Sequence, residues 1–451
     1  MTTIKNLTFT YDLQNKILDN LSLTIPTKEF SLLVGPSGCG KSTLLKILVA
    51  LYPKYAGQLT GEVDLNGLRA AMLFQNASEQ FTMSTPREEI IFALENLQVD
   101  REQYAQRLKL AVKFTQIDYL LDQKINTMSG GEQQRVALAV LVAMDVDLYL
   151  LDEPFASCDP DARRFLINKL AALKKQGKTI LISDHLLSNY QNICDNIFQF
   201  QKKVITKLSA AAKDNLLQKN KDKKNYHFAL PQSEQPCFTL TNTKISENRL
   251  LLNQKHLQIM AGKTTLITGA NGIGKTSLFN ALSKMLSYDG SLTYYDHEIS
   301  QLSTRKYLRQ VGQVFQKASD QFINISVADE LNLSKKSPNN HFFTDPEINK
   351  ALIALELDQT LDQVVYSLSG GQQKKLQILL MIIASQAVLL LDEPLSGLDN
   401  HSAKQIINLL KENQARQEQT LVIITHDLTN IAEWCDYHLV FKNQQLTYVT
   451  K

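Results

Sequence analysis

The sequence predicts an α/β fold made of two tandem domains of one kind, each built on a mainly parallel β-sheet. Short apolar runs, typical of buried parallel strands, are each followed by a polar motif. The complete set of motifs occurs twice, in the same order, at offsets of 234 to 241 residues. The length of 451 residues suits two domains of roughly 200 residues each.

Composition excludes several classes of protein. Hydrophobic residues make up 44% and charged residues 21% of the chain, which argues against global disorder and against a fibrous repeat. The five cysteines form no Cys-x-x-Cys pair, so we expect a reducing cytosol and no zinc, iron–sulfur or disulfide framework. The first residues lack a secretory-signal pattern, and the most apolar window, residues 376–391, is shorter than the roughly 20 residues that span a bilayer. Any membrane role is therefore expected to act through a partner.

The first repeated motif is a glycine-rich loop between a predicted strand (residues 30–34 or 264–268) and a predicted helix. In this setting main-chain N–H groups converge on phosphates at the helix N-terminus. Each loop ends in a lysine that would neutralise the β and γ oxygens, followed by a hydroxyl residue that would hold Mg²⁺. A glycine-rich turn would be the alternative for a single copy, but two copies in this context make a phosphate site the better interpretation. The expected phosphate-binding residues are Gly35, Pro36, Ser37, Gly38, Cys39, Gly40, Lys41, Ser42 and Thr43 in the first half, and Gly269, Ala270, Asn271, Gly272, Ile273, Gly274, Lys275, Thr276 and Ser277 in the second.

The second motif is a pair of adjacent acids after an apolar strand: Asp152 and Glu153, then Asp392 and Glu393, 240 residues later. Neighbouring residues on a strand point to opposite sides, so one carboxylate can serve the metal while the other faces the attacking water. We assign both aspartates, with Ser42 and Thr276, to Mg²⁺, and both glutamates to the water. A surface acidic pair is the alternative, and the repetition disfavours it.

Two further motifs follow the same repeat. His185 and His426 each come after an apolar strand; a single such histidine is more often structural, but the repeated position favours a catalytic role. Residues 129–131 and 369–371, both Ser-Gly-Gly, precede helical stretches and predict a second anion site in each half. A helix-starting turn remains the alternative for the Ser-Gly-Gly segments.

The joint between the halves is a lysine-rich segment. Residues 202–224 hold eight lysines against two aspartates, whereas the whole chain has a net charge of only +3. This composition is too polar to bury and predicts a tether. The predicted domains are residues 1–205 and 236–451, joined by a basic linker, residues 206–235.

These motifs together resemble the ATP-binding cassette (ABC) ATPases, and the resemblance covers nearly the whole chain twice. It implies two tandem P-loop NTPase domains, each with an added antiparallel β subdomain and a helical signature subdomain, with ATP and Mg²⁺ as cofactors. By the same resemblance Gln75 and Gln316 are Q-loop residues at the metal and the reacting phosphate, and the two histidines are switch residues. The signature residues are Ser129, Gly130, Gly131 and Glu132 in the first half, and Ser369, Gly370, Gly371 and Gln372 in the second.

The resemblance also implies how the halves cooperate. In that family two cassettes pack head to tail, with ATP between the phosphate loop of one and the signature of the other. We therefore expect an intramolecular cassette pair in which the first phosphate loop works with residues 369–372 and the second with residues 129–132. Fusion raises the effective concentration of each half for the other.

The two halves depart from each other at several positions. Tyr11, 30 residues before Lys41, matches the family's adenine-stacking aromatic, but the same count from Lys275 reaches Ile245. The D-loop aspartates are Asp159 and Asp399, in segments that also differ. Both halves keep the catalytic glutamate and histidine, so we expect two competent sites with different rates.

A narrower resemblance lies around the Q-loops. Residues 74–96 look like the energy-coupling factor (ECF) importer ATPases, in which this region receives arginine-bearing coupling helices of a membrane subunit. Glu79 and Asp320 are the candidates for such contacts, with a merely solvated face as the alternative.

The resemblance implies an energy-coupling ATPase at the cytoplasmic face of the membrane. Its partners would be a polytopic transmembrane coupling subunit and a substrate-binding membrane subunit, with a vitamin, a vitamin precursor or a transition metal as cargo. A soluble twin-cassette factor that acts on ribosomes or nucleic acid is one alternative, and a fused sugar-importer ATPase is another. Because the basic excess belongs to the linker and only about 30 residues separate the cassettes, no nucleic-acid partner is expected.

Overall fold

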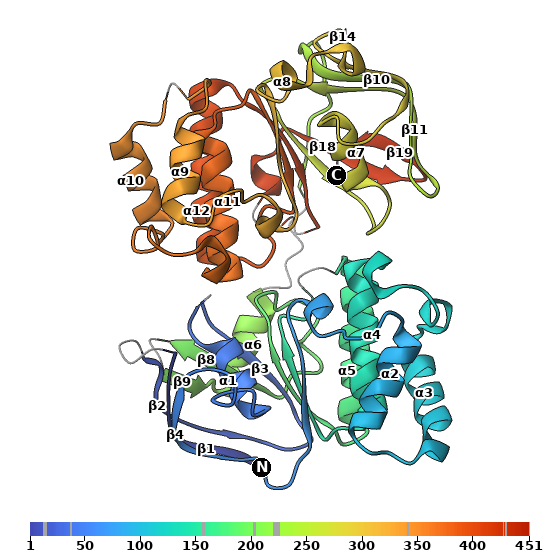
Figure 1. The fold of residues 1–451 in the computed structure, drawn as a ribbon, viewed down its shortest axis with the longest axis vertical. Coiled ribbons are helices and arrows are strands. Elements are labelled where there is room, and N and C mark those ends of the chain that lie inside the picture. Colours follow the sequence, from blue (N-terminus) through green and yellow to red (C-terminus); the bar gives the residue numbers. More distant parts are fainter. Residues whose placement is uncertain are drawn as a thin grey trace. The chain divides into compact units, whose positions relative to one another are not determined.

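The computed structural model describes residues 1–11, 16–36, 38–155, 158–201, 204–219, 226–340, 342–426, 428 and 431–450. The chain divides into two units, Met1–Lys223 and Lys224–Lys451 (Figure 1). Each unit is an α/β domain with a mainly parallel sheet, an antiparallel sheet and a group of helices, so the predicted fold class is confirmed. None of the helices in these ranges combines the length and the apolar character that crossing a bilayer requires.

The first unit is built on a six-stranded sheet with the order β5-β6-β7-β3-β8-β9, which is parallel except for β9, the strand antiparallel to β8. All residues of β3, β6 and β7 are buried, because helices cover both faces of a parallel sheet. A three-stranded antiparallel sheet, β2-β1-β4, packs beside it. The strands are β1 Thr2–Thr10, β2 Lys16–Ile25, β3 Phe30–Val34, β4 Gln58–Asp64, β5 Ala70–Leu73, β6 Leu148–Asp152, β7 Thr179–Ser183, β8 Asn196–Gln201 and β9 Val204–Lys207.

The helices of the first unit fall into two groups. The helices α2, α3 and α4 lie side by side around their own apolar core (Figure 1), whereas α1 and α5 pack on the parallel sheet. The helices are α1 Lys41–Leu48, α2 Pro86–Asn96, α3 Arg101–Thr115, α4 Gly130–Met144, α5 Pro160–Lys175 and α6 Ala210–Lys219, with 3₁₀ turns η1 Ala77–Glu79, η2 Asp118–Leu120 and η3 Ile125–Thr127.

The second unit repeats this plan. Its six-stranded sheet has the matching order β15-β16-β17-β12-β18-β19, and its antiparallel sheet has the order β11-β10-β13-β14. The strands are β10 Pro236–Ser246, β11 Leu250–Met260, β12 Thr264–Thr268, β13 Asp289–Tyr294, β14 His297–Glu298, β15 Val311–Val314, β16 Val388–Asp392, β17 Thr420–Ile424, β18 Tyr437–Lys442 and β19 Gln445–Val449. The helices are α7 Lys275–Leu282, α8 Thr304–Tyr307, α9 Val327–Lys335, α10 Asp345–Ala354, α11 Gly370–Ile383 and α12 Asn400–Gln417, with 3₁₀ turns η4 Ile299–Gln301, η5 Ala318–Asp320, η6 Val365–Ser367 and η7 Ala432–Trp434.

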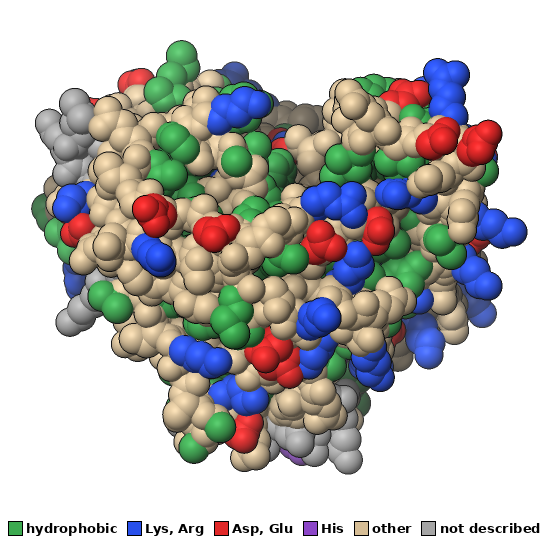
Figure 2. Space-filling model, turned by 90° about the horizontal axis from the view of Figure 1, so that it is seen from below, with side chains coloured by type: hydrophobic (Ala, Val, Ile, Leu, Met, Phe, Trp, Pro, Cys, Tyr) green, Lys and Arg blue, Asp and Glu red, His purple; other side chains and the backbone are tan. Residues whose placement is uncertain are grey.

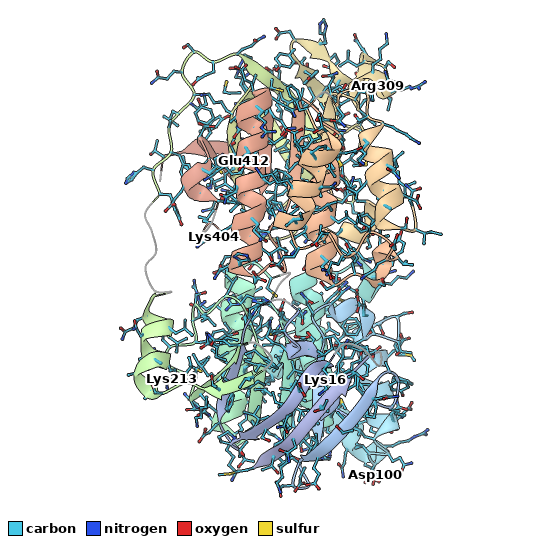
Figure 3. All side chains as sticks on the ribbon, turned by 90° about the vertical axis from the view of Figure 1, so that its left-hand side faces the viewer. Lys16, Asp100, Lys213, Arg309, Lys404 and Glu412 are labelled. Atoms are coloured by element: carbon cyan, nitrogen blue, oxygen red, sulfur yellow. The ribbon has the colours of Figure 1, made fainter. Side chains whose placement is uncertain are left out.

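Part of the segment expected to be a polar tether folds onto the two units. The helix α6 buries Leu217 in the core of the first unit, and Lys213 on the same helix (labelled in Figure 3) donates to the carbonyls of residues 194 and 195. At the other end Phe228 is buried in the core of the second unit. The lysine-rich composition gave no sign of this packing, which depends on a few apolar residues at each end. Across the face in Figure 2, acidic and basic side chains are interspersed.

Candidate active site

The two phosphate loops have the backbone geometry that their glycines permit. Each loop follows the central strand of its sheet, β3 or β12, and ends where α1 or α7 begins. Gly40 and Gly274 precede these helices with left-handed φ values of 104° and 113°. A Cβ atom would lie 2.9 Å from a Leu18 carbon at Gly40 and 2.9 Å from a Leu251 carbon at Gly274. Glycine is therefore required at both positions.

The loop lysines lie inside the loops that they close. Lys41 Nζ donates to the carbonyl oxygens of Gly35 and Pro36, both at 2.8 Å. Lys275 Nζ likewise donates to the carbonyl oxygens of Gly269 at 2.7 Å and Ala270 at 2.9 Å. Both ammonium groups are thus held where a bound phosphate would meet them. Ser37, the remaining predicted member of the first loop, lies outside the described residues.

The predicted metal ligands are in contact in both units. Asp152 accepts hydrogen bonds from the Ser42 and Ser183 hydroxyls, the latter at 3.1 Å. Thr276 Oγ1 donates to Asp392 Oδ2 at 2.7 Å. Burial raises the pKa of both aspartates. A hydroxyl beside a carboxylate is the set of hard oxygen ligands that Mg²⁺ prefers, so the residues fit a magnesium ion held together with phosphate oxygens.

The first-unit glutamate sits where three segments meet. Glu153 has a left-handed φ of 43° and donates its main-chain N–H to the Ser183 carbonyl at 2.9 Å. Gln75 Nε2 donates to Glu153 Oε2 at 3.0 Å, and His185 Nε2 lies 2.6 Å from Glu153 Oε1 without forming a hydrogen bond to it. A non-glycine residue in the left-handed region is strained, and such strain is common at reacting sites. The structure therefore brings together three of the predicted catalytic residues.

The second-unit glutamate is held differently. Glu393 has a φ of 47°, and Thr425 Oγ1 donates to its Oε2 at 3.1 Å. His426 Nε2 lies 3.4 Å from Glu393 Oε1 and 3.3 Å from Lys275 Nζ. Burial, with the Asp392 charge adding to it, raises the pKa of Glu393 to about 7. The two water-polarising candidates thus share a position but not their hydrogen-bond partners.

Sequence reasoning missed a buried lysine behind the second Q-loop. Lys374 on α11 is 3% exposed, and its Nζ donates to the carbonyls of Phe315 at 3.1 Å and Gln316 at 3.0 Å. Burial lowers the pKa of Lys374 to about 8, against the attraction of Asp392 and Glu393. The sequence sign of this lysine was its position in the repeat: it lies 240 residues after Gln134, so a charged residue replaces a neutral one at equivalent positions of the two halves.

The first unit uses that neutral residue for the same contact. Gln134 on α4 is 2% exposed, and its Nε2 donates to the Gln75 carbonyl at 3.2 Å. The Gln134 Oε1 atom is buried and has no partner among the described residues. One neutral hydrogen bond in the first unit thus corresponds to two charge-assisted bonds in the second.

A buried ion pair supports the first switch histidine and was also missed. Asp184, which precedes the histidine, accepts from Arg163 Nη1 at 2.9 Å and from the Tyr190 hydroxyl at 2.6 Å. In the second unit Thr425 and Ala403 stand at the corresponding positions. Sequence alone gives little sign of this pair, because its members lie 21 residues apart on different elements.

The signature segments are capped helix N-termini. Ser129 caps α4 by accepting from the Glu132 N–H, and the Glu132 carboxylate accepts in return from the Ser129 N–H at 2.9 Å. Ser369 and Gln372 form the same reciprocal pair at the start of α11. Each segment therefore presents the positive end of a helix dipole, which suits an anion.

The D-loop aspartates are helix caps as well. Asp159 Oδ1 accepts from the N–H of Ala162 at 2.8 Å, and Asp399 Oδ1 accepts from that of Ser402 at 2.8 Å. Both therefore fix the start of the helix, α5 or α12, that follows the acidic pair.

Tyr11, the candidate for adenine stacking, lies against the helix that follows the first phosphate loop, whereas the residue found by counting in the second half is buried. Tyr11 is 48% exposed, and its hydroxyl lies 3.1 Å from Thr43 Oγ1 on α1. Ile245 is wholly buried in the core and is not available to a ligand. The side chain that contacts the matching position of α7 is Glu247, which accepts from Ser277 Oγ at 2.7 Å.

Comparisons with known proteins agree with this geometry. The family model described as "ABC transporter" matches residues 18–156 and 252–396. The "Putative HMP/thiamine import ATP-binding protein YkoD" of Bacillus subtilis (strain 168) is 26% identical over 99% of this chain and 90% of its own length. A "Putative ABC transporter ATP-binding protein" of Treponema denticola is 29% identical over 99% of this chain and 96% of its own.

Solved structures of similar shape include the "RNase-L Inhibitor", with a TM-score of 0.68 and 20% identity over 99% of this chain and 90% of that one. The "Model of ribosome-bound archaeal Pelota and ABCE1" gives a TM-score of 0.74 and 18% identity over 99% of this chain and 78% of that one. At these identities the likeness establishes the fold and nothing further.

Proposed function

The chain belongs to the ABC transporter family, and we propose that it is the ATP-hydrolysing energy-coupling subunit of an energy-coupling factor importer. In this proposal residues 1–205 and 236–451 are the two cassettes, and residues 206–235 join them. The protein binds peripherally, at the cytoplasmic face of the membrane, to a polytopic coupling subunit that works with a substrate-binding membrane subunit. That last subunit selects the cargo, a vitamin, a vitamin precursor or a transition metal.

The proposed hydrolysis uses equivalent residues of each cassette. In the first, Lys41 would neutralise the β and γ oxygens of ATP, and Ser42 and Asp152 would hold Mg²⁺, which when bound would supply further charge neutralisation. Glu153 polarises the attacking water, while Gln75 and His185 keep its carboxylate in place. In the second cassette Lys275, Thr276, Asp392 and Glu393 have the same roles, and Thr425 and His426 lie against the Glu393 carboxylate. Gln316 is assigned, as the Q-loop residue, to the metal and the reacting phosphate.

We further propose that each ATP is completed by the signature of the other cassette. Residues 369–372 would meet the nucleotide of the first phosphate loop and residues 129–132 that of the second. The capped helix N-termini support this role, because their dipoles favour the γ-phosphate charge.

One observation carries the importer proposal: both cassettes present an exposed acid on a short turn directly after the Q-loop. Glu79 ends η1 and Asp320 ends η5, and both side chains are exposed. Glu79 is oriented by a hydrogen bond from Asn76 Nδ2 at 2.9 Å. Exposed acids repeated at one place suit basic segments of a partner. The similarity to a thiamine-import ATP-binding protein over 99% of the chain supports the same conclusion.

The second cassette adds an exposed apolar surface beside this turn. Ile323 is 80% exposed and Ile325 is 70% exposed, and side chains of this kind mark surfaces that a partner covers. The first-cassette counterpart of Ile323 is Thr82, because Glu89 accepts the Thr82 N–H just as Glu330 accepts the Ile323 N–H. The proposed coupling subunit therefore meets two different surfaces.

Co-purification from detergent-solubilised membranes tests the importer proposal. The tagged chain should retrieve a small polytopic protein, and combined Glu79→Arg and Asp320→Arg substitutions should release it while ATP hydrolysis continues. Glu62→Arg, an exposed acid on β4, is the control and should retain the partner. Recovery of ribosomes in place of a membrane protein would contradict the proposal.

The assigned chemistry has its own test. Glu153→Gln and Glu393→Gln, made singly and together, should reduce ATP turnover and leave ATP binding intact. Normal hydrolysis by the double variant would refute the water-polarising role of these glutamates.

A further inference from the structure

We propose that the two nucleotide sites recognise the base by different chemistry: an aromatic ring, Tyr11, in the first cassette and a charged pair, Glu247 and Arg249, in the second. This inference rests on the proposed nucleotide sites and adds which side chains of each site contact the base. It implies that the second site accepts purine nucleotides with less preference for adenine and holds them with more dependence on salt.

The strand register places Tyr11 and Glu247 at corresponding points. In the first cassette Thr10 is the last residue of β1, pairs with Lys16 of β2, and is followed by Tyr11. In the second cassette Ser246 is the last residue of β10, pairs with Leu250 of β11, and is followed by Glu247. Each residue therefore directly follows the last residue of the first strand of its hairpin.

Contacts with the following helix confirm the correspondence of position. The Tyr11 hydroxyl lies 3.1 Å from Thr43 Oγ1, and Glu247 Oε1 accepts from Ser277 Oγ at 2.7 Å. Thr43 and Ser277 are both the third residue of their helix, α1 or α7. A carboxylate thus reaches the helix position that the aromatic residue reaches in the first cassette.

Arg249 brings a cation to the same place. Its Nη2 donates to the carbonyl of Gly272, inside the phosphate loop, at 2.7 Å. The hairpin that carries it is tight, because the Glu247 N–H donates to the Arg249 carbonyl at 3.1 Å. Both side chains are exposed, so a nucleotide on the phosphate loop can reach them.

The two arrangements differ in what they can select. An aromatic ring binds a base through stacked area, and its removal costs roughly tenfold or more in affinity. A guanidinium is planar and can also stack on a base, but its charge is screened by salt. A carboxylate accepts hydrogen bonds from amino groups of either purine. Stacking on a ring is open to every base, so the ring alone favours neither purine. Guanine offers a carboxylate two adjacent hydrogen-bond donors and adenine only its amino group, so the charged pair shifts the preference of the second site away from adenine.

Binding of ribose-labelled fluorescent ATP and GTP to the full-length chain tests the inference. Lys275→Ala leaves the first site to be measured, and Lys41→Ala leaves the second. The first site should prefer ATP over GTP by more than the second does, and Tyr11→Ala should weaken ATP binding about tenfold at the first site only.

Substitutions of Arg249 separate stacking from simple charge attraction. Arg249→Ala should weaken binding at the second site about threefold to tenfold, and the loss should shrink as salt is raised. Arg249→Lys keeps the charge without the plane and should weaken binding as well. Lys244→Ala, an exposed cation on β10, is the control and should change nothing.

Two results would overturn the inference. One is unchanged affinity in Arg249→Ala, and the other is full affinity in Arg249→Lys, which would leave only phosphate attraction. Failure of the unsubstituted chain to bind either nucleotide would instead refute the proposed function itself.

Discussion

Lys374 is the residue that most clearly separates the two proposed catalytic sites. Its ammonium group is buried, makes two hydrogen bonds to the Q-loop backbone and lies near two carboxylates. A buried cation of this kind holds the Q-loop and favours the ionised form of the carboxylates that it faces. The neutral Gln134 of the first cassette can supply only the first of these effects.

The first prediction concerns this lysine. Lys374→Gln should lower the maximal ATP turnover about threefold to tenfold and leave the nucleotide KM nearly unchanged, because the loop contact survives and the charge is lost. Steady-state ATPase kinetics measure the maximal turnover and the KM separately. Lys375→Gln is the matched control, since Lys375 faces Glu356 at 3.7 Å, and it should behave as the unsubstituted chain. A raised KM with unchanged turnover would contradict the prediction.

A buried histidine predicts how stability depends on pH. His438 on β18 is 6% exposed, its Nε2 lies 2.7 Å from Thr268 Oγ1, and its buried Nδ1 has no partner among the described residues. Burial lowers the pKa of His438 from 6.5. Below pH 6.5 this histidine is therefore protonated more readily in the unfolded chain than in the folded chain. The free energy of unfolding consequently decreases as the pH is lowered.

The second prediction follows from that sign. Chemical denaturation should show the second unit losing stability as pH is lowered from about 7.5 to about 5.5, and His438→Gln should remove part of the loss. His256→Gln, an exposed histidine on β11, serves as the control and should leave the pH dependence unchanged. An identical pH profile for His438→Gln and the unsubstituted chain would exclude this role for the histidine.

At the scale of elements, the helix α5 supports the switch segment of the first cassette. Arg163 on α5 pairs with Asp184 at 2.9 Å and also donates to the carbonyls of Leu186 at 2.5 Å and Ser188 at 3.2 Å. These bonds fix both sides of His185. The helix α12 has Ala403 at the matching position, so the second switch segment depends on other contacts.

The third prediction is that Arg163→Ala destabilises the first unit by about 3–5 kcal/mol, because Asp184 is left buried without its ionic partner. Urea denaturation followed by a probe in the first unit measures this. Arg164→Ala on the same helix is the control: its ion pair with Asp161 is exposed, and its loss should cost about 0.5 kcal/mol or less. Equal effects of the two substitutions would contradict the argument.

The sequence could predict the elements that carry phosphate chemistry, because a strand, glycines, a lysine and a helix lie next to one another in the chain. It could not place Glu247 by counting. The first hairpin joins Thr10 to Lys16 and the second joins Ser246 to Leu250, a loop two residues shorter. A fixed count back from Lys275 therefore reaches two residues too far, into the core at Ile245.

Contacts between distant elements were not predictable for a different reason. Lys374 and Arg163 act through partners 59 and 21 residues away, and only the folded arrangement of helix, strand and loop brings each pair together. Similarly, Leu217 and Phe228 lie within the segment expected to be a polar tether, and its composition gives no sign of their burial. Local spacing predicts local chemistry, whereas support from other elements needs the fold.

At the scale of the whole molecule, the described apolar clusters belong to one unit or the other. Those of the first unit run from Ile4 to Leu217, and those of the second run from Phe228 to Leu446. Leu170 on α5 and Leu410 on α12 are both wholly buried, 240 residues apart, each in the core of its own unit. Each cassette therefore carries its own source of stability.

The fourth prediction follows from these separate cores. Calorimetry without nucleotide should show two unfolding transitions. Leu170→Ala should lower the free energy of unfolding of only one unit, and Leu410→Ala that of only the other, each by about 2–5 kcal/mol. With Mg²⁺ and ATP bound to the Glu153→Gln, Glu393→Gln chain, both transitions should rise together, because each nucleotide in a composite site would stabilise both cassettes at once. A rise of one transition alone after Lys41→Ala or Lys275→Ala would instead indicate sites confined to single cassettes. The same experiment thus separates the composite-site proposal from two independent ATPases in one chain.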